Sequence, residues 1–457
     1  MASTSASPAT AWLVARAARL RLAEPVARLI AGSIRSLHQS GHAAAVEVLA
    51  LDKTGLLEDL QASLVPTGRA NIQVLDRGLI KAMARAFIPE EVTDNYYLSD
   101  EPHLIAAKAA YRDFLARVWR RLSMLRRIDG VVSANFAYFA ERELHAVLEE
   151  AGVPFLVMHK ENTKTPGRLD FWRQVYGGRR GPFDGRRILV YNEVEKRLQI
   201  DCRIAAPERI SVTGMPRLDR LHHWRRENAG RPSSGPARVL FFYFGERTGL
   251  PFIPLFGRSI YRGEGGDIDP TLKDLNWHDL ARDTAEAIRR LAVENPDIEV
   301  LVKGKKEHGK GQSLADRMAA GGPLPENLRL VTDGDPFELI VEADVVCGFV
   351  TTAMLEALAA GKPVVMPAFA EATDAAMAPY LMALPGVAEL ADGPWDLIAK
   401  LTAAARRRQA PAMELAPAVA AELQRWSGNA DGAAGRRVAE VILAEIDGAL
   451  AGASAAE

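Results

Sequence analysis

The stretch CGFVTTAMLEALAAGKPVVMP, Cys347 to Pro367, holds one complete strand-to-helix unit and the start of the next strand. An apolar run ends at the Cys-Gly pair, a turn with two threonines follows, and AMLEALAAG has the composition of a short helix. Gly361 suits the end of that helix, and KPVVMP is apolar and β-branched again. This order predicts a parallel sheet with helices on its faces.

Similar units recur along the whole chain. The first set of apolar runs covers 45–51, 130–134, 154–159, 187–192 and 209–214, and the second covers 237–244, 297–304, 327–332, 343–349 and 362–367. A stretch rich in Gly, Pro, Ser and charge divides the two sets. We therefore expect two doubly wound α/β domains, at 41–228 and 237–400, with a linker at 229–236 and helical segments at 1–40 and 401–457.

The composition limits the expected partners and cofactors. Charge is nearly balanced, with Lys+Arg 57 against Asp+Glu 58, so nucleic acid is not an expected partner. Two cysteines, Cys202 and Cys347, are too few for a disulfide framework, which favours a reducing, cytoplasmic setting. The Asp-Gly-Asp sequence at 333–335 has the spacing of a metal-binding motif, but a proline follows it and it is expected to begin a helix. We predict no metal and no cofactor.

Residues 11–37 form a basic and apolar segment. They carry five arginines and one glutamate, namely Arg16, Arg19, Arg21, Arg28 and Arg35 with Glu24. Such a segment suits a helix packed on its own domain, a partner-docking helix, or peripheral contact with the inner face of the cytoplasmic membrane, and it also has features of an organellar transit peptide. The chain has no run of eighteen or more apolar residues, so no membrane-spanning segment is predicted.

Polar residues at the turn of the opening stretch suggest an anion site. Backbone N–H groups at a helix N-terminus favour a phosphate, and the hydroxyls of Thr351 and Thr352 can add donors. Gly348 allows close approach of a ligand, and the carboxylate of Glu356 could accept hydrogen bonds from sugar hydroxyls. The alternative is that one threonine only caps the helix and that Glu356 is an exposed helix residue.

Two other strand ends add candidates for the same site. Lys303 and Lys305 follow the strand at 297–304 and would complement a diphosphate. Gly245 and Arg247 follow the strand at 237–244, where the arginine could reach a phosphate or a leaving group. A solvated lysine turn and an ordinary polar loop are the alternatives.

The first half of the chain offers an acceptor site. His159 and Glu161 directly follow an apolar strand, and either has the chemistry of a general base, although His159 could equally be a structural histidine. The accompanying candidates for acceptor binding are Asn135, Lys160, Asn162 and Lys164.

Three longer motifs carry a family resemblance: VTGMPRLDRL (212–221), DPFELIVEADVVCGFVTTAMLEALAAGKPVVMP (335–367) and GNADGAAGRRVAEVI (428–442). In these the chain resembles bacterial glycosyltransferases of the GT-B fold, especially those of surface and capsular polysaccharide assembly. This set includes the Kdo-transferase-like group and the related CDP-glycerol glycerophosphotransferases. The K-P-H-P motif of phosphopolyol transferases appears here as the sequence KGKK at 303–306, which makes that branch less favoured.

The resemblance implies two Rossmann-like domains that face a cleft. It also implies that Thr351, Thr352 and Glu356 contact a nucleotide-sugar donor and that the N-terminal domain binds a glycan or lipid-linked acceptor. The leading hypothesis is a metal-independent glycosyltransferase. A phosphopolyol transferase or sugar-nucleotide epimerase on the same fold, and a noncatalytic nucleotide- or glycan-binding scaffold, are the alternatives.

Overall fold

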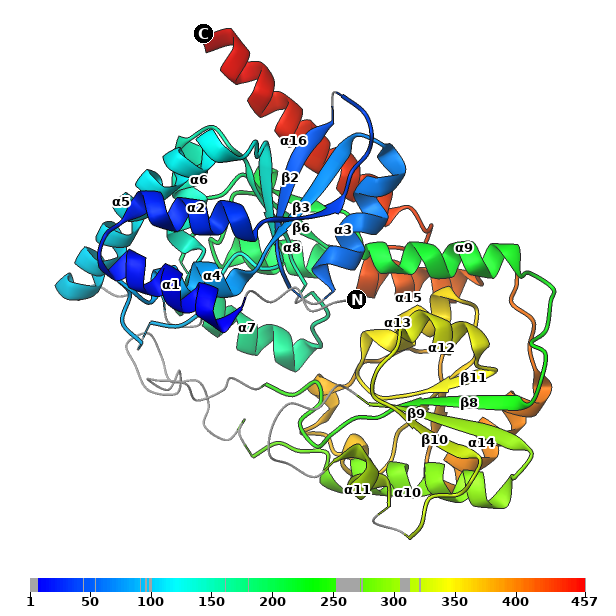
Figure 1. The fold of residues 1–457 in the computed structure, drawn as a ribbon. Helices are drawn as coiled ribbons and strands as arrows, with labels where there is room; N and C mark the ends of the chain where they lie inside the picture. Colours follow the sequence, from blue (N-terminus) through cyan, green and yellow to red (C-terminus); the bar gives the residue numbers. More distant parts are fainter. Residues whose placement is uncertain are drawn as a thin grey trace.

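The computed structural model describes residues 7–456 with gaps at 44, 54, 91, 95–96, 98–100, 161, 180, 252–271, 273, 305–312 and 320–321. These residues form two α/β domains, one built on a seven-stranded sheet and the other on a six-stranded sheet (Figure 1). The segment 229–236, predicted as the linker, lies between helix α9 (Asp219–Glu227) and strand β8 (Ala237–Phe242), which belongs to the second sheet.

The N-terminal sheet has the strand order β1-β3-β2-β4-β5-β6-β7. All of its neighbouring strands pair in parallel except β1, which runs antiparallel to β3 at the edge. The strands are β1 (Arg35–His38), β2 (Val46–Leu51), β3 (Ala70–Leu75), β4 (Gly130–Ser133), β5 (Phe155–Met158), β6 (Arg187–Val190) and β7 (Ile210–Val212). The strand order reverses between β2 and β4, and the crevice beyond the carboxyl ends at such a point is where doubly wound sheets bind ligands.

The C-terminal sheet is entirely parallel and has the order β10-β9-β8-β11-β12-β13. Its strands after β8 are β9 (Ile298–Lys303), β10 (Leu328–Val331), β11 (Val345–Cys347), β12 (Val364–Pro367) and β13 (Glu389–Ala391). This is the strand order of a dinucleotide-binding doubly wound fold, and its reversal lies between β8 and β11. The turn in the opening stretch directly follows β11, so it lies at the reversal.

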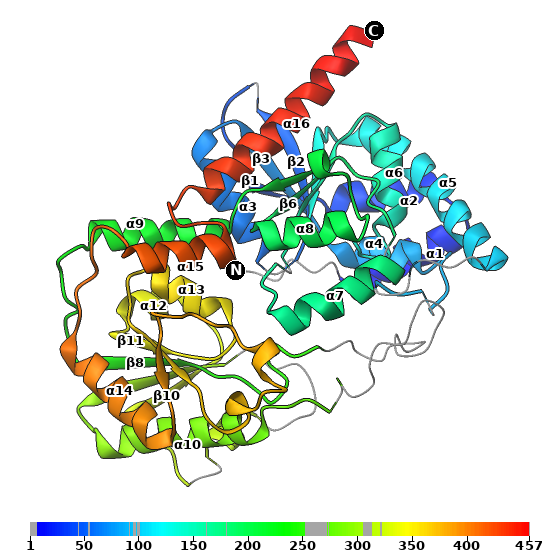
Figure 2. The same cartoon turned by 180° about the vertical axis from the view of Figure 1, so that it is seen from behind.

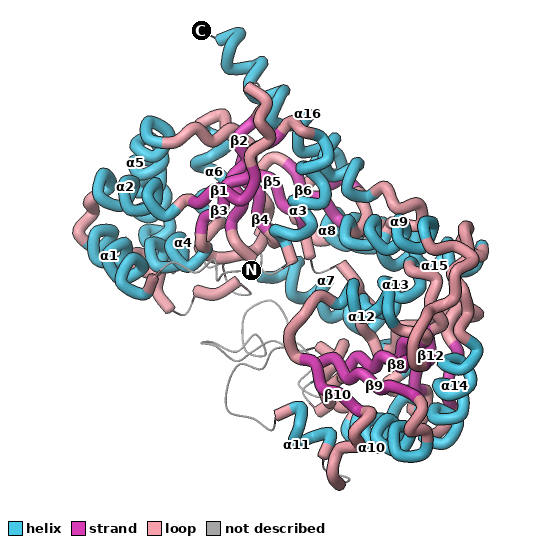
Figure 3. Tube along the Cα trace, turned by 45° about the vertical axis from the view of Figure 1, so that its right-hand side comes forward, coloured by secondary structure: helices cyan, strands magenta, loops and turns pink. Residues whose placement is uncertain are grey.

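Helices cover both faces of each sheet (Figure 3). In the N-terminal domain they are α1 (Pro8–Arg19), α2 (Ala23–Ser33), α3 (Leu56–Leu64), α4 (Arg77–Ala84), α5 (Pro102–Leu125), α6 (Arg142–Glu150), α7 (Pro166–Arg179) and α8 (Glu193–Asp201), whereas α9 packs on the C-terminal domain. The later helices are α10 (His278–Glu294), α11 (Leu314–Met318), α12 (Pro336–Glu342), α13 (Thr352–Ala359), α14 (Pro394–Arg407), α15 (Pro417–Ser427) and α16 (Ala434–Ala456). None of the helices in the described part of the chain is both long enough and apolar enough to cross a bilayer.

Alternate residues of each strand supply two cores, one on each face of the sheet. In β2, Val48 and Ala50 pack into one hydrophobic cluster while Leu49 and Leu51 pack into the other. This double burial explains why the strands read as nearly continuous apolar runs in the sequence.

The last helix, α16, returns to the N-terminal domain and covers one face of its sheet (Figure 2). Val438, Ile442 and Ile446 are buried there with the side chains of β2 and β4. A Cβ atom at Gly130 would lie 2.7 Å from Cδ1 of Ile446, so the helix fits closely against the sheet. The first sheet therefore depends on the end of the chain for one of its covering layers.

Each of the ten predicted apolar runs contains a strand, and the predicted class of fold is confirmed. Three strands differ from the sequence interpretation. Strand β1 lies within the 1–40 segment that was expected to be helical, and its side chains are exposed or half-buried. Strand β3 alternates apolar and polar residues, and β13 has three residues at a sheet edge, so both give weak signals. Helix α14 spans residue 400, where the C-terminal domain was expected to end.

Candidate functional site

A pocket of ≈ 1560 Å³ lies between the two domains. It is lined by α3, the 3-10 turn at Pro216–Leu218, α9, the start of α12, α13 and α16. Its charged lining residues are Glu58, Asp59, Arg69, Arg217, Asp219, Arg220, Asp335, Glu356, Arg436, Glu440 and Asp447. Helices α3, α12 and α13 follow strands β2, β10 and β11, and the 3-10 turn follows β7. Residues at the carboxyl ends of strands from both sheets therefore meet in this pocket, as expected of a ligand site.

Arg217 is one of the four described arginines that line the pocket. Its Nη2 donates to the hydroxyl of Tyr191 at 3.3 Å, and its buried Nε has no hydrogen-bond partner among the described residues. Burial alone would lower the pKa of Arg217, but Tyr191, Asp59 and Glu356 more than offset this, so the net shift is upward. The side chain thus stays charged where it lines the pocket.

Glu356 faces Arg217 from the C-terminal domain. It lies on α13 and is 6% exposed, so the expectation of an exposed helix residue does not apply. Burial raises the pKa of its carboxyl group, while Arg217 and Arg220 lower it, and the net shift is upward. This carboxyl group can therefore hold a proton or accept a hydrogen bond from a hydroxyl inside the pocket.

Lys160 joins the N-terminal wall of the pocket. Its ammonium group donates to the carbonyl oxygen of Gly55 at 2.8 Å and pairs with the carboxylate of Asp59. Asp59 and Gly55 both line the pocket. The predicted acceptor residue Lys160 therefore lies behind the lining and holds the start of α3 in place.

Arg220 and Asp335 link the two domains at the pocket. The two guanidinium nitrogens of Arg220 lie 2.5 and 2.6 Å from the two carboxylate oxygens of Asp335. Asp335 is also the N-cap of α12, where its side chain accepts a hydrogen bond from the backbone of Phe337. The sequence prediction that the Asp-Gly-Asp segment begins a helix is confirmed. Among the described residues no group of three or more His, Cys, Asp or Glu side chains could hold a metal ion.

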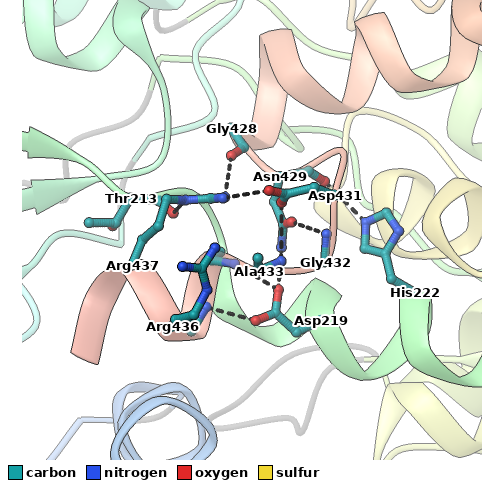
Figure 4. Close-up of polar contacts among 12 residues, drawn as sticks. Thr213, Asp219, His222, Gly428, Asn429, Asp431, Gly432, Ala433, Arg436 and Arg437 are labelled. Carbon is teal, nitrogen blue, oxygen red and sulfur yellow. Dashed lines mark hydrogen bonds and ion pairs between the residues drawn. The ribbon is translucent and has the colours of Figure 1, made fainter. Parts of the chain in front are cut away.

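Two of the family-like motifs meet beside the pocket (Figure 4). Asp219, at the start of α9, accepts hydrogen bonds from the side-chain amide of Asn429 at 2.7 Å and from the backbone N–H of Gly435 at 2.7 Å. Arg437 donates to the carbonyl oxygens of Thr213 and Gly428 at 2.9 and 3.1 Å. We call these contacts the clasp, because they hold the start of α16 against the turn that carries Arg217.

His222 belongs to the clasp and should make its stability depend on pH. It is fully buried with Nε2 3.1 Å from the carbonyl oxygen of Asn429, and burial lowers its pKa to about 4. The unfolded histidine binds a proton below about pH 6.5, whereas the folded one binds it only when the pH approaches or falls below its lowered pKa of about 4. Stability is therefore expected to fall as the pH decreases from about 6.5 to about 4.

Thermal unfolding of the wild type and of His222→Gln at pH 7 and pH 5 tests this effect. We expect the wild type to lose more stability than the variant between these conditions. A residual loss in the variant is expected from His145, which is also buried and has a strongly lowered pKa. Equal losses in the two proteins would contradict the role of His222.

His159, predicted as a catalytic base, lies in a buried ionic cluster and does not line the pocket. Its Nε2 is 3.1 Å from Glu195, whose other carboxylate oxygen pairs with Lys164. Burial acts to raise the pKa of Glu195, but Lys164 and His159 lower it to about 2. All three side chains are fully enclosed in the N-terminal domain, a location typical of a structural cluster. Glu161, the other predicted base, lies outside the described residues.

The two predicted asparagines shape the loops after β4 and β5. The side chain of Asn135 accepts a hydrogen bond from the backbone of Ala137 at 2.9 Å. Asn162 accepts one from the backbone of Tyr191 at 3.0 Å and donates to the carbonyl oxygen of His159. Both side chains are buried. Their role in acceptor binding stays a prediction.

Among the described residues, the predicted donor residues other than Glu356 do not line the pocket. Thr351 is the N-cap of α13 and accepts from the backbone of Ala353 at 3.4 Å, while Thr352 is the first residue of the helix. Gly348 packs closely on Met354, since a Cβ there would lie 2.7 Å from its methyl group.

The candidates after β8 and β9 contact backbone carbonyl groups. Lys303 donates to the carbonyl oxygen of Thr332 at 2.7 Å, and burial lowers its pKa. Arg247 donates to the carbonyl oxygens of Pro251 and Leu272 at 2.8 and 3.2 Å, in the loop that Gly245 begins. Lys305 lies outside the described residues. The described cations at this end of the C-terminal sheet thus fix loops, and their donor role stays a prediction.

Sequence reasoning did not single out Arg217, Arg220 or Asp59 as site residues. The two arginines stood within the quoted VTGMPRLDRL motif, which was a usable signal. Asp59 is one of two acidic residues on helix α3, and only the fold brings it to Arg217 and Glu356.

Comparison with known proteins gives likeness at the level of fold. No protein-family model matches the sequence, and no curated protein matches it. Among solved structures, the chain is similar to the UDP-GlcNAc 2-epimerase from Neisseria meningitidis bound to UDP-GlcNAc, with 12% identity and a TM-score of 0.44 over 87% of this chain and 100% of that one.

Two further structures are similar over nearly their whole length. The glycotransferase of kitacinnamycin has 15% identity and a TM-score of 0.43 over 88% of this chain and 99% of that chain. The wall teichoic acid polymerase TagF has 11% identity and a TM-score of 0.48 over 96% of this chain and 97% of that chain. With its two doubly wound domains and the pocket between them, the chain has the GT-B fold.

Proposed function

We propose that the chain is a glycosyltransferase that moves a sugar from a nucleotide-sugar donor to a glycan or lipid-linked acceptor in bacterial surface polysaccharide synthesis. The observation that supports this best is the meeting of Arg217, from the N-terminal domain, with Glu356, from the C-terminal domain, in one pocket. Transfer between two substrates needs such an arrangement, because donor and acceptor must be held together with water excluded.

Negative charge collects on the donor's diphosphate as the reaction proceeds. The bond from the sugar to a diphosphate oxygen breaks, and the acceptor oxygen takes its place on the sugar. Arg217 is proposed to stabilise the departing phosphate, since its charged guanidinium group lines the pocket. Lys303, Lys305 and the α13 N-terminus with Thr351 and Thr352 are proposed to bind the rest of the nucleotide diphosphate.

Glu356 is proposed to bind hydroxyl groups of the donor. Its carboxyl group is buried next to Arg217, so a hydroxyl that hydrogen-bonds to it would bring the sugar or ribose against the guanidinium. Gly245, Arg247 and Gly348 at the reversal of the C-terminal sheet are proposed to shape the remainder of the donor site.

The acceptor is proposed to enter from the N-terminal domain. A base must take the proton of the acceptor hydroxyl, and the described pocket offers the carboxylate of Asp59, which Lys160 positions. Glu161, the next residue after Lys160, remains the second candidate for this role. The proposed acceptor-binding residues are Asn135, Lys160, Asn162 and Lys164, with His159 as the buried alternative base.

Nucleotide binding tests the proposal directly. We expect one of CMP, CDP, UDP, GDP, ADP and dTDP to raise the thermal unfolding midpoint, because a ligand at 100 times its dissociation constant adds about 2.7 kcal/mol of stability. Glu356→Gln and the double change Thr351→Val/Thr352→Val are expected to reduce this stabilisation. Glu338→Gln is a matched control, because Glu338 is exposed on the neighbouring helix α12.

Stabilisation by none of these nucleotides, with the wild type folded, would contradict a donor site and favour the scaffold hypothesis. Once the nucleotide is known, the corresponding nucleotide sugars can be tested for turnover. Conversion that needs no acceptor and leaves the nucleotide attached to the sugar would instead identify an epimerase. Consumption of a nucleotide-activated polyol would identify a phosphopolyol transferase.

A further inference from the structure

The N-terminal domain carries an exposed apolar surface far from the pocket. It comprises the outer sides of α1, the α1–α2 turn, α2 and the end of α5, which lie side by side on the flank away from the C-terminal domain (Figure 1). Trp12 is 58% exposed, Leu20 61% and Met124 74%. With Leu13, Leu22 and Leu125 these make six of the thirteen large apolar side chains that are exposed among the described residues. We call this the flank surface.

The flank surface is also strongly basic. Its two segments, 7–35 and 115–128, are fully described and contain ten arginines, no lysine and one acidic residue, Glu24. Asp129, the next residue after the second segment, pairs with Arg127 at 2.8 Å. The arginines are Arg16, Arg19, Arg21, Arg28, Arg35, Arg117, Arg120, Arg121, Arg126 and Arg127. Against a net charge of −1 for the whole chain, this local excess is large. Such a surface attracts a partner that carries dense negative charge.

The helices that carry this surface are fixed to the domain on their inner sides. Val14, Val26 and Ile30 are buried in the N-terminal core. Glu24 lies 2.9 Å from Arg28 and 3.4 Å from Arg121, which joins α2 to α5. The exposed apolar side chains therefore belong to helices that are packed on the domain, and not to a detached N-terminal tail.

We propose that the flank surface docks the protein on an anionic lipid bilayer. Tryptophan and leucine side chains would enter the boundary between headgroups and acyl chains, while the arginines would contact lipid phosphates. The mixture of large apolar residues and arginine on one helix layer fits this partner, because the apolar side chains meet the acyl-chain boundary and the arginines meet the phosphates just outside it. Docking needs no substrate, so this inference does not depend on the proposed function.

Vesicle sedimentation with the full chain tests the proposal. We expect the wild type to sediment with vesicles of phosphatidylcholine and phosphatidylglycerol, to bind pure phosphatidylcholine far less, and to be released by raised salt. The variant Trp12→Ser/Leu20→Ser/Met124→Ser is expected to bind at least about 10-fold more weakly, because its apolar anchors are lost. These side chains are exposed, so the variant should stay folded, and its thermal midpoint checks this.

Trp395→Ser is the matched control. Trp395 is 59% exposed and has Arg290 3.9 Å above its ring, as Trp12 is 58% exposed and has Arg16 5.3 Å from its ring. It lies on α14 of the other domain, so its loss should leave vesicle binding unchanged. Absence of wild-type binding to the anionic vesicles would overturn the proposal and leave an acidic protein as the fitting partner. Equal binding by the triple variant, or equal weakening by Trp395→Ser, would also overturn it.

Discussion

Replacing Arg217 with alanine is expected to lower kcat/KM of the sugar transfer by about 100- to 1000-fold while the chain stays folded. The guanidinium group lines the pocket and interacts with the charges of both Asp59 and Glu356. Its loss would leave the departing phosphate without this donor. It would also remove a positive charge that reduces the repulsion between the carboxyl groups of Asp59 and Glu356. The measurement is steady-state transfer with the nucleotide sugar identified by the binding screen.

Two further variants make this result specific. Arg69→Ala removes an arginine that lines the same pocket but pairs with Asp447 at its outer end, so we expect little change in the transfer rate. Arg217→Lys keeps the charge and loses the fixed geometry of the guanidinium, so an intermediate rate is expected. If Arg217→Ala transferred sugar as fast as Arg69→Ala, Arg217 would not contact the reacting phosphate.

Replacing Gly428 with alanine is expected to destabilise the protein by about 3–5 kcal/mol. Gly428 has φ +62°, and a Cβ there would lie 1.8 Å from the carbonyl oxygen of Tyr191. A displacement would open the clasp, because Arg437 bonds to the carbonyl oxygen of this glycine. Urea unfolding, followed by a probe of each domain, measures the loss.

Gly230→Ala is the control for the backbone conformation alone. Gly230 has φ +74°, and a Cβ there would meet nothing within 4 Å. Its replacement should cost only about 1 kcal/mol, the penalty for a left-handed alanine. Equal losses in the two variants would show that the close approach of Gly428 to Tyr191 is not needed for stability.

The fold was predictable because parallel strands buried on both faces leave an apolar signal in the sequence. Strand β11 ends where the opening stretch begins and helix α13 lies within it, as expected, and Gly361 follows the C-cap residue Ala360 with φ +73°. Strand β1 gave no such signal, because an edge strand with exposed side chains resembles a loop. Topology could not be read from the strands alone, since their spatial order depends on long-range pairing.

The candidate site was predictable only in part. Glu356 was identified from its place one turn into a helix that follows a strand, and it does line the pocket. Thr351 fits the same pattern, but its hydroxyl caps its own helix. Asp59 and Arg217 come from distant parts of the chain and meet through the packing of α3 on the turn after β7. The spacing of residues along the sequence could not predict the contact between Asp59 and Arg217.

The return of α16 to the first sheet also sets an order of events during synthesis. Strands β2 and β4 leave the ribosome early, but Val438, Ile442 and Ile446, which cover one of their faces, are made after the whole C-terminal domain. Helix α3 covers part of this face, but the part that α16 covers must stay exposed for most of translation, a state that chaperones bind and that favours aggregation. In the described part of the chain, the core of the C-terminal domain contains no residue of α16, but a ribosome that stalls before this helix releases a chain whose first domain cannot close its own core.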